Sequence, residues 1–311
     1  MGFRQPCTSK YATSAITINP FQAAPNPMHT TTPLPPAYPQ RWQSLNLRWW
    51  RPWLALLLLI LLFAATYGAL ALLLAIWRLP TPAPLGLLLA VLLAPLVALV
   101  PVTRLAVRWG LGQGGGLMDA PTRRFRWRWA LCALGVSVVL FLPMLAIEML
   151  WLNPAPLRPE PNLFGLALFL LLLVPFQAAG EEYLFRGFLS QFIGQWLRSR
   201  RWAFWLPLLL TSLLFALVHG QQDLPLFLTR FGLGAVFFWL TWHSGGLEAA
   251  IALHAASNLL AFAQSLLTGT TLSALFSSEV DWRLALVQLL ASAAIAVLLV
   301  RLQHRHRKTA A

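Results

Sequence analysis

The sequence predicts an all-α membrane protein that crosses the bilayer about eight times. Hydrophobic residues make up 58% of the 311 residues, charged residues make up only 10%, and the mean hydropathy is +0.66. Such a chain is too apolar for a soluble domain of this size, and a helix of about 20 apolar residues is long enough to cross a bilayer. A multi-pass protein of the cell membrane is therefore expected. Apolar runs of about this length lie at roughly 54–77, 84–102, 130–151, 163–180, 203–219, 226–243, 247–267 and 283–302.

The positive charges predict the orientation of these helices. Lys and Arg gather in the cytoplasmic loops of membrane proteins, and all four clusters fall on one side when both termini are cytoplasmic. The formal net charge of +14 then reflects loops that lie against anionic lipid headgroups, so no nucleic-acid partner is expected. The clusters are Arg41, Arg48 and Arg51; Arg104, Arg108, Arg123, Arg124, Arg126 and Arg128; Arg198, Arg200 and Arg201; and Arg301, Arg305, Arg307 and Lys308.

Three regions are expected along the chain. Residues 1–50 are rich in Pro, Thr, Ser and Asn, show no apolar periodicity, and lack the pattern of a signal peptide. Such a segment buries too little surface to offset its ordering entropy, so a disordered tail is predicted. Residues 51–302 form the transmembrane helical domain, and residues 303–311 form a basic tail.

Two adjacent carboxylates stand out in the fourth apolar run. Only 9 residues of the chain are Asp or Glu, yet Glu181 and Glu182 follow the run directly. Ionisable groups at membrane depth are costly and commonly mark a functional site. On a helix, Glu182 and Arg186 are an i, i+4 pair and are expected to form an ion pair. Glu181 is rotated by about 100° and stays free for another partner. A purely structural ion pair is the alternative interpretation.

Further polar side chains occur in the fifth and seventh runs. Phe215 and His219 are spaced i, i+4 at the end of the fifth run, and His254 and Asn258 have the same spacing in the seventh. Lipid offers these groups no hydrogen-bond partners. Three helices are therefore expected to bring a polar cluster together inside the bundle.

This set of residues is typical of a hydrolytic site. A carboxylate withdrawn from water takes up and returns a proton near neutral pH, and a neighbouring imidazole helps to activate a water molecule. A second His with an Asn amide one turn away donates hydrogen bonds to the oxyanion of a tetrahedral intermediate. Alternatively, one Glu and two His hold a zinc ion that activates the water, with Glu181, His219 and His254 as ligands. The residues themselves leave this choice open.

Three motifs in order resemble the CPBP family of intramembrane proteases, which includes the CAAX prenyl proteases and the Abi proteins. They are EExxxR at Glu181–Arg186, FxxxH at Phe215–His219 and HxxxN at His254–Asn258. The resemblance covers roughly residues 163–266, which would form the catalytic core. Each motif alone is weak evidence. All three together, in this order and on separate spans of one eight-helix chain, make a strong signal.

The resemblance implies an endopeptidase that cleaves membrane-associated or lipidated peptides, including prenylated CAAX proteins. Carried onto this sequence, it implies that Glu181 and His219 activate water and that His254 and Asn258 bind the oxyanion. Glu182 and Arg186 would position the helix, with Phe215 in support. The family is catalogued with metalloproteases, and a metal-free glutamate mechanism is also argued for it.

Two other classes of protein compete with the protease. The first is a transporter or proton-coupled carrier that uses the buried Glu, Arg and His groups as a relay, although the internally repeated halves common in that class are not visible here. The second is a catalytically silent membrane scaffold that keeps the fold.

The depth of the site residues poses a geometric problem for the protease interpretation. In the simple topology His219 ends its helix near the outer side, whereas His254 lies nearer the inner side. Glu181 is about 27 Å along its helix from Leu163, which also places it toward the inside. Tilted helices, staggered spans or a helix break between Pro175 and Gly180 are needed to bring these groups level.

Overall fold

The secondary structure of the described residues consists of helices joined by loops and turns, with no strand. The computed structural model describes residues 36–77 and 83–309, and within them eight helical stretches are long and apolar enough to cross a membrane. The predicted fold class is confirmed, while the cytoplasmic location of both termini stays a prediction. The stretches are α1 (Arg51–Trp77), α2 (Leu85–Ala106) with η2 (Val107–Leu111), α3 (Trp127–Ile147) with η4 (Glu148–Leu152), α4 (Leu163–Glu182) with η5 (Tyr183–Leu189) and α5 (Ser190–Gly194), α6 (Arg200–Leu217), α7 (Leu224–Ser244), α8 (Glu248–Thr268) and α10 (Trp282–Thr309).

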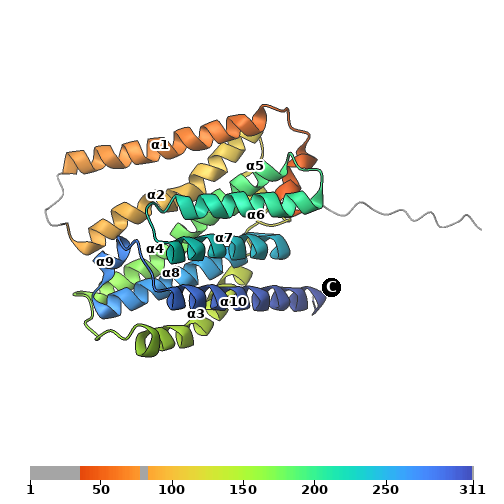
Figure 1. The fold of residues 1–311 in the computed structure, drawn as a ribbon. Helices are drawn as coiled ribbons and strands as arrows, with labels where there is room; N and C mark the ends of the chain where they lie inside the picture. The colour runs from red at the N-terminus through yellow and green to blue at the C-terminus, as the bar shows by residue number, and fades with distance from the viewer. Residues whose placement is uncertain (1–35, 78–82, 310–311) are drawn as a thin grey trace, which may run out of the picture. The chain divides into compact units, whose positions relative to one another are not determined.

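Helix α8 lies among the spanning helices (Figure 1). Helix α8 packs against α3, α4, α7 and α10, and its residues from Glu248 to Ser257 are all buried. Ala249, Ala250, Ala252 and Ala256 allow these neighbours to approach closely. The Arg126 guanidinium fixes the start of α8 by donating two hydrogen bonds, of 2.9 and 2.7 Å, to the fully buried Glu248 carboxylate.

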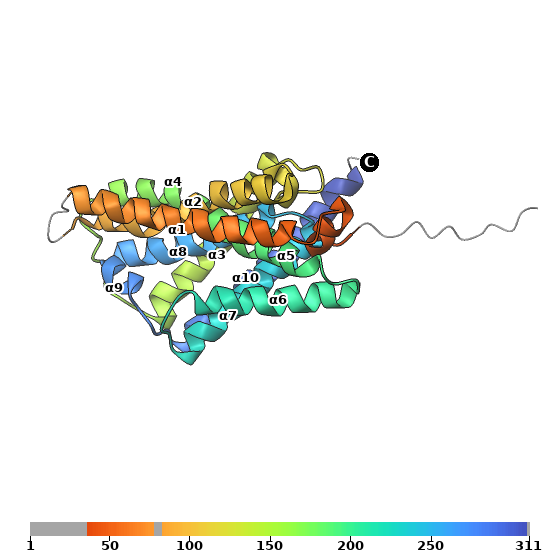
Figure 2. The ribbon, with the colours of Figure 1, turned by 90° about the horizontal axis from the view of Figure 1, so that it is seen from above.

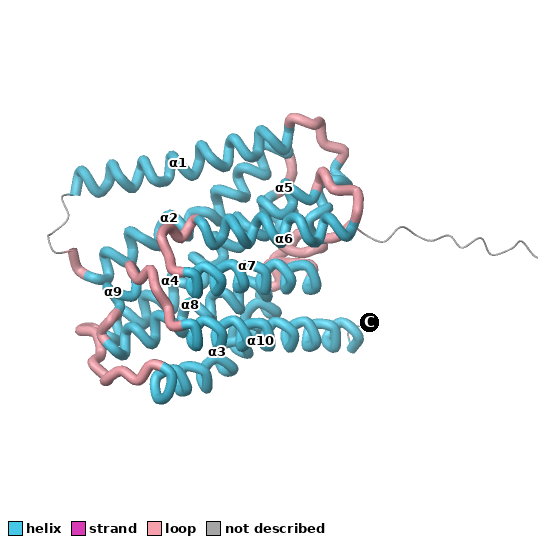
Figure 3. Tube along the Cα trace, viewed as in Figure 1, coloured by secondary structure: helices cyan, strands magenta, loops and turns pink. Residues whose placement is uncertain are grey.

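Helix α1 forms one edge of the helical domain (Figures 1 and 2). It packs mainly on α2 and η2, and only Pro52, Ala55 and Leu59 are buried along it. Leucine and isoleucine side chains cover its remaining surface and are exposed, as expected of a helix that faces lipid tails. Loops join many of the described helices, as the tube in Figure 3 shows.

The span that carries the acidic pair is longer than its apolar run. The run ends at residue 180, but the helical stretch continues without a break through a π-helical segment to Gly194. Glu181, Glu182, Arg186 and Ser190 resemble the polar end of a membrane helix in sequence. They are all buried by neighbouring helices, because tertiary contacts supply the partners that lipid lacks.

Gly180 allows α4 to lie directly on α2. A Cβ atom at this position would clash with the backbone oxygen of Leu96 and would come within 3.2 Å of Leu99 Cβ. The close approach places the residue before Glu181 against a fixed backbone. Packing on α2 therefore sets the position of the acidic pair.

The structure differs from the predicted disordered tail at its carboxyl end. Residues Tyr38–Leu45 form a short 3-10 helix, η1. Trp42 is buried, and its ring contacts Phe188 edge-on at 5.4 Å between centroids, while Gln40 Nε2 donates to the backbone oxygen of Leu197 at 2.7 Å. A few anchoring side chains order this segment although its composition resembles that of a tail. The rest of the predicted tail, residues 1–35, lies outside the described residues.

The last span also runs beyond its predicted end. The apolar run ends near residue 302, whereas α10 continues to Thr309 through most of the predicted basic tail. Arg, Lys, Gln and His are compatible with helix, so polarity alone does not end it. Segment η1 and the carboxyl end of α10 lie at the same end of the helical domain (Figures 1 and 2). An even number of crossings requires this.

Candidate active site

The structure brings all three motifs into one polar cluster between α4, α6 and α8. The fourth span, α4 with η5, contributes Glu181, Glu182 and Arg186, and α8 contributes His254 and Asn258. Phe215 and His219 come from the end of α6 and the residues just after it. The predicted convergence of polar groups from three helices is therefore confirmed, while the role of each residue in catalysis stays a prediction.

Glu182 and Arg186 form the ion pair expected from their spacing. Arg186 Nη1 donates to Glu182 Oε1 at 2.9 Å, and both side chains are fully buried. The other terminal nitrogen, Nη2, donates to the backbone oxygen of Gly234 on α7 at 2.9 Å. The guanidinium carbon also lies 4.7 Å from the centre of the Phe215 ring, at a distance typical of a cation–π contact. Arg186 therefore ties α4, α6 and α7 together.

His254 lies between the two glutamates. Its Nδ1–H donates to Glu182 Oε1 at 2.9 Å, because an ionised carboxylate only accepts hydrogen bonds. Its Nε2 lies 3.6 Å from Glu181 Oε2. Phe237 stacks on the imidazole with 4.7 Å between centroids and 15° between the planes. The ring orientation is thus fixed by Glu182 on one side and by Phe237 on its face.

A glutamine connects Glu181 to Asn258. Gln177 Nε2 donates to Glu181 Oε1 at 2.6 Å, and Asn258 Nδ2 donates to Gln177 Oε1 at 3.0 Å. The second carboxylate oxygen, Glu181 Oε2, is buried and has no hydrogen-bond partner within the described residues. An unpaired oxygen of a buried carboxylate is costly unless water or a ligand binds it.

His219 is held with one nitrogen available for chemistry. Its Nδ1–H donates to the backbone oxygen of Phe215 at 2.6 Å, so in the neutral ring Nε2 carries the lone pair. Although the side chain is largely exposed, desolvation by the surrounding protein lowers the pKa of His219, and the Glu181 carboxylate acts in the opposite direction. The ring is therefore a neutral proton acceptor at neutral pH.

Aromatic rings line the apolar side of the cluster. The Phe215 ring lies 5.3 Å from Phe185, 5.0 Å from His219 and 5.7 Å from His254, measured between centroids. Phe215 is buried. It separates the two imidazoles and shields the Glu182–Arg186 pair from solvent, which strengthens the electrostatic contacts inside.

The zinc site predicted as an alternative does not appear in the donor geometry. No group of three or more His, Cys, Asp or Glu side chains within residues 36–77 and 83–309 is arranged to hold a metal ion. Two of the intended ligands, Glu181 and His254, approach to 3.6 Å. The Nδ1 atoms of both His219 and His254 are engaged within the protein, which leaves Nε2 of each ring as the nitrogen that could bind a metal. Zinc at Glu181, His219 and His254 stays a prediction.

The ends of the spans are staggered, and this brings Glu181 to the same depth in the bundle as the end of α6. Glu181 is about 20 Å from Gly194 at 1.5 Å per residue, and Phe215 is about 22 Å from Arg200. A short connection joins Gly194 to Arg200, so these distances start from the same end of the bundle. The extension of the fourth span to Gly194, rather than a break near Pro175, brings the acidic pair level with the end of α6.

The fold and the cluster define a multi-pass membrane protein with a cluster of polar side chains inside its helical domain. Residues 163–260, about a third of the chain, match the family model described as type II CAAX prenyl endopeptidase Rce1-like. This match confirms the resemblance to the CPBP family over these residues, and at the level of the family it supports a CAAX-type intramembrane endopeptidase. No curated protein and no solved structure matches the chain.

Two site residues were missed from the sequence. Gln177 lies four residues before Glu181, and its i, i+4 spacing to that carboxylate was a usable signal. Phe237 on α7 had no such signal, because it is one of 19 phenylalanines in an apolar chain. Only the tertiary structure shows that it stacks on His254.

We expect Gln177→Met to lower kcat for peptide cleavage by about 10- to 100-fold. The variant keeps the length of the side chain but removes two hydrogen bonds, one of them to a charged group, which is worth about 1.5–3 kcal/mol. KM should change little, because Gln177 positions Glu181 and Asn258 without touching the substrate. The measurement is steady-state kinetics, with thermal unfolding in parallel.

Gln288→Met is the matched control for this variant. Gln288 is also a glutamine of a spanning helix and donates to Ser257 Oγ of α8 at 3.2 Å. It should keep kcat. Equal losses of kcat in both variants, accompanied by equal losses of thermal stability, would mean that Gln177 acts only in packing.

Proposed function

We propose that the protein is an intramembrane endopeptidase that hydrolyses peptide bonds of membrane-associated or prenylated, CAAX-type proteins with a water activated by Glu181 and His219. The observation that carries the proposal is the orphan oxygen Glu181 Oε2, which is buried, unpaired within the described residues and 3.6 Å from His254 Nε2. A water bound there would contact both a general base and Nε2 of His254.

The first chemical step follows from the lone pairs of the site. Glu181 Oε2, with His219 Nε2 as a second acceptor, takes a proton from the water while the water oxygen bonds to the scissile carbonyl carbon. Gln177 holds the other carboxylate oxygen at 2.6 Å, so Oε2 keeps its direction. Fixed geometry of this kind supplies much of the rate of an enzyme.

The tetrahedral intermediate would be stabilised from α8. Asn258 Nδ2 has a second hydrogen to donate to the oxyanion, and Nε2 of His254 lies beside Oε2 of Glu181. The Glu182–Arg186 pair holds Nδ1 of His254 at 2.9 Å. Collapse of the intermediate breaks the C–N bond, and Glu181 returns its proton to the leaving amine.

The proposed mechanism uses no metal. Glu181 and His219 supply acceptors for the proton of the water from the chain itself. The engaged Nδ1 atoms of both histidines leave each Nε2 free, which suits proton transfer and equally suits a metal ion. A bound zinc ion would supply Lewis-acid activation of the same water. The proposed substrate is a lipidated or membrane-embedded peptide. The proposed partner is the lipid bilayer of the cell membrane. The family match gives no support to the transporter or to the scaffold.

The test is cleavage by the purified protein in lipid nanodiscs. A farnesylated peptide that ends in a CAAX sequence and its unprenylated twin serve as substrates, and mass spectrometry follows the loss of the last three residues. We expect cleavage that is at least ten times faster for the prenylated peptide and that survives a metal chelator. Cleavage abolished by the chelator would overturn the metal-free mechanism, and no cleavage of either peptide would overturn the substrate class.

A further inference from the structure

A large pocket lies on the face of α4 opposite the acidic pair. It has a volume of about 740 Å³ and lies between α2, α3, α4, α8 and the loop that carries η3 (Gly115–Met118). Phe176, Ala179 and Tyr183 line it from α4, and their i, i+3, i+7 spacing puts them on one helical face. Gln177 and Glu181 lie on the other face. None of the predicted catalytic residues lines this pocket, which is therefore distinct from the candidate active site.

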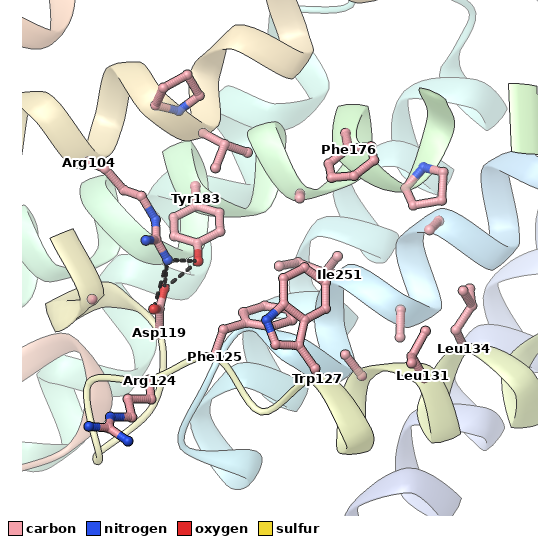
Figure 4. Close-up of a pocket in the computed structure, with 18 of the residues that line it drawn as sticks. Arg104, Asp119, Arg124, Phe125, Trp127, Leu131, Leu134, Phe176, Tyr183 and Ile251 are labelled. Atoms are coloured by element: carbon pink, nitrogen blue, oxygen red, sulfur yellow. Dashed lines mark hydrogen bonds and ion pairs between the residues drawn. The ribbon is translucent and has the colours of Figure 1, made fainter. Parts of the chain in front are cut away.

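The pocket has one polar end and one apolar end (Figure 4). At the polar end Arg104 Nη2 donates to Asp119 Oδ1 at 2.6 Å and to the Tyr183 hydroxyl at 2.8 Å, while the Tyr183 hydroxyl donates to Asp119. At the apolar end Leu131 and Leu134 of α3 face Phe176 of α4 (Figure 4). Phe125 and Trp127 lie between the two ends, with 4.5 Å between their ring centroids.

Positive charge is in excess at the polar end. Arg104, Arg123 and Arg124 line the pocket, against a single carboxylate, that of Asp119. Asp119 is engaged by Arg104. Arg123 and Arg124 are exposed and form no ion pair within the part of the chain that the structure describes. Arg123 Nη1 donates one long hydrogen bond, of 3.4 Å, to the neutral Gln113 Oε1. Both guanidinium groups thus keep donors for an anion, and guanidinium is well suited to phosphate.

We propose that this pocket binds one anionic phospholipid of the bilayer, with its phosphate at Arg123 and Arg124 and one acyl chain along α3 and α4. Charge complementarity selects an anionic headgroup, and basic pockets between membrane helices on the cytoplasmic side bind such headgroups. The apolar end selects an acyl chain over a free phosphate, because the side chains of Leu131, Leu134 and Phe176 have neither a positive charge nor a hydrogen-bond donor for an anion. A tryptophan between the ends suits the boundary between headgroup and tails.

The site is built for a permanent lipid rather than for surface attraction alone. Its walls come from four spanning helices, and its volume is within the range of about 300–1,000 Å³ of pockets that hold small molecules. Tyr183, which directly follows Glu182, belongs to its polar end. The inference does not depend on the proposed function, since it concerns a different face of α4.

The experiment compares lipid retention by native mass spectrometry. Full-length protein is purified in detergent with equal amounts of phosphatidylglycerol and phosphatidylcholine, and the bound lipid is counted. We expect one phosphatidylglycerol to be retained at least tenfold over phosphatidylcholine. The double variant Arg123→Gly/Arg124→Gln should lose this preference by tenfold or more, whereas Arg198→Gln/Arg201→Gln, two exposed arginines at and just before the start of α6, should keep it.

Two features of the design keep a negative result meaningful. Arg123 has a φ of 56°, a conformation in which glycine is favoured over other residues, so Arg123→Gly leaves the turn able to form. Leu131→Trp fills the apolar end without touching the charges and should also lower retention by tenfold. Equal retention of both lipids, unchanged retention in the arginine or Leu131 variants, or displacement by millimolar inorganic phosphate alone would each overturn the proposal.

Discussion

Glu181→Gln is expected to lower the rate of peptide cleavage by about 10²–10⁴-fold, the usual contribution of a general base. The amide keeps the size of the side chain and accepts the hydrogen bond from Gln177, now 2.6 Å from Oε1, through its carbonyl oxygen. It removes the basicity of Oε2, the atom proposed to take the proton of the water. Folding should change little, because Oε2 has no partner to lose within the described residues.

The measurement for Glu181→Gln has a chemical and a cellular arm. The chemical arm is the nanodisc assay with the prenylated peptide, and the cellular arm compares peptide termini in host membranes that contain either protein. Peptide termini that occur with the wild-type protein and are absent with the variant, at an equal level of the two proteins, identify the natural substrates. Glu148→Gln, a change to a partly buried carboxylate on another span, is the matched control and should keep full activity. Full activity of Glu181→Gln would contradict the proposed mechanism.

Arg186→Met is expected to cause the largest loss of stability of any single change in the site. It leaves the Glu182 carboxylate buried without its cation, and breaking a buried ion pair from one side costs about 3–5 kcal/mol. The hydrogen bond to the Gly234 carbonyl and the contacts with Phe215 are lost as well. At about 2–4 °C per kcal/mol, Tm should fall by about 10 °C.

A second variant separates the structural role of the ion pair from its role in catalysis. Glu182→Leu/Arg186→Met removes both charges, and apolar residues of similar volume often replace a buried ion pair without net cost. We expect most of the Tm to return, measured by thermal unfolding in one detergent. Activity should not return, because His254 Nδ1 loses the acceptor that orients its ring.

Arg230→Met is the control for the arginine change. Arg230 also lies in a spanning helix, but its Nη1 donates to the neutral Gln222 Oε1 at 2.7 Å. Its removal should lower Tm by much less than the removal of Arg186. A double variant that is less stable than Arg186→Met alone would show that the cost lies in side-chain packing and not in an uncompensated charge.

The sequence by itself determined the class of fold and indicated most of the polar side chains that meet in the cluster. Long apolar runs in a chain with 10% charged residues permit little except membrane helices, because water and lipid sort side chains by polarity. The polar residues within these runs were conspicuous for the same reason. Helical periodicity also predicted the Glu182–Arg186 pair, since an i, i+4 contact depends on one helix alone.

The tertiary structure decided what depends on contacts between helices. It showed that the fourth span continues to Gly194 and that η1 is ordered, because in both places neighbouring helices satisfy groups that look solvated in sequence. It also placed Gln177 between Glu181 and Asn258, set Phe237 on His254, and opened the basic pocket between α2, α3, α4 and α8. Local patterns encode a helix and its faces, whereas the partner of each face is fixed only when all the helices pack together.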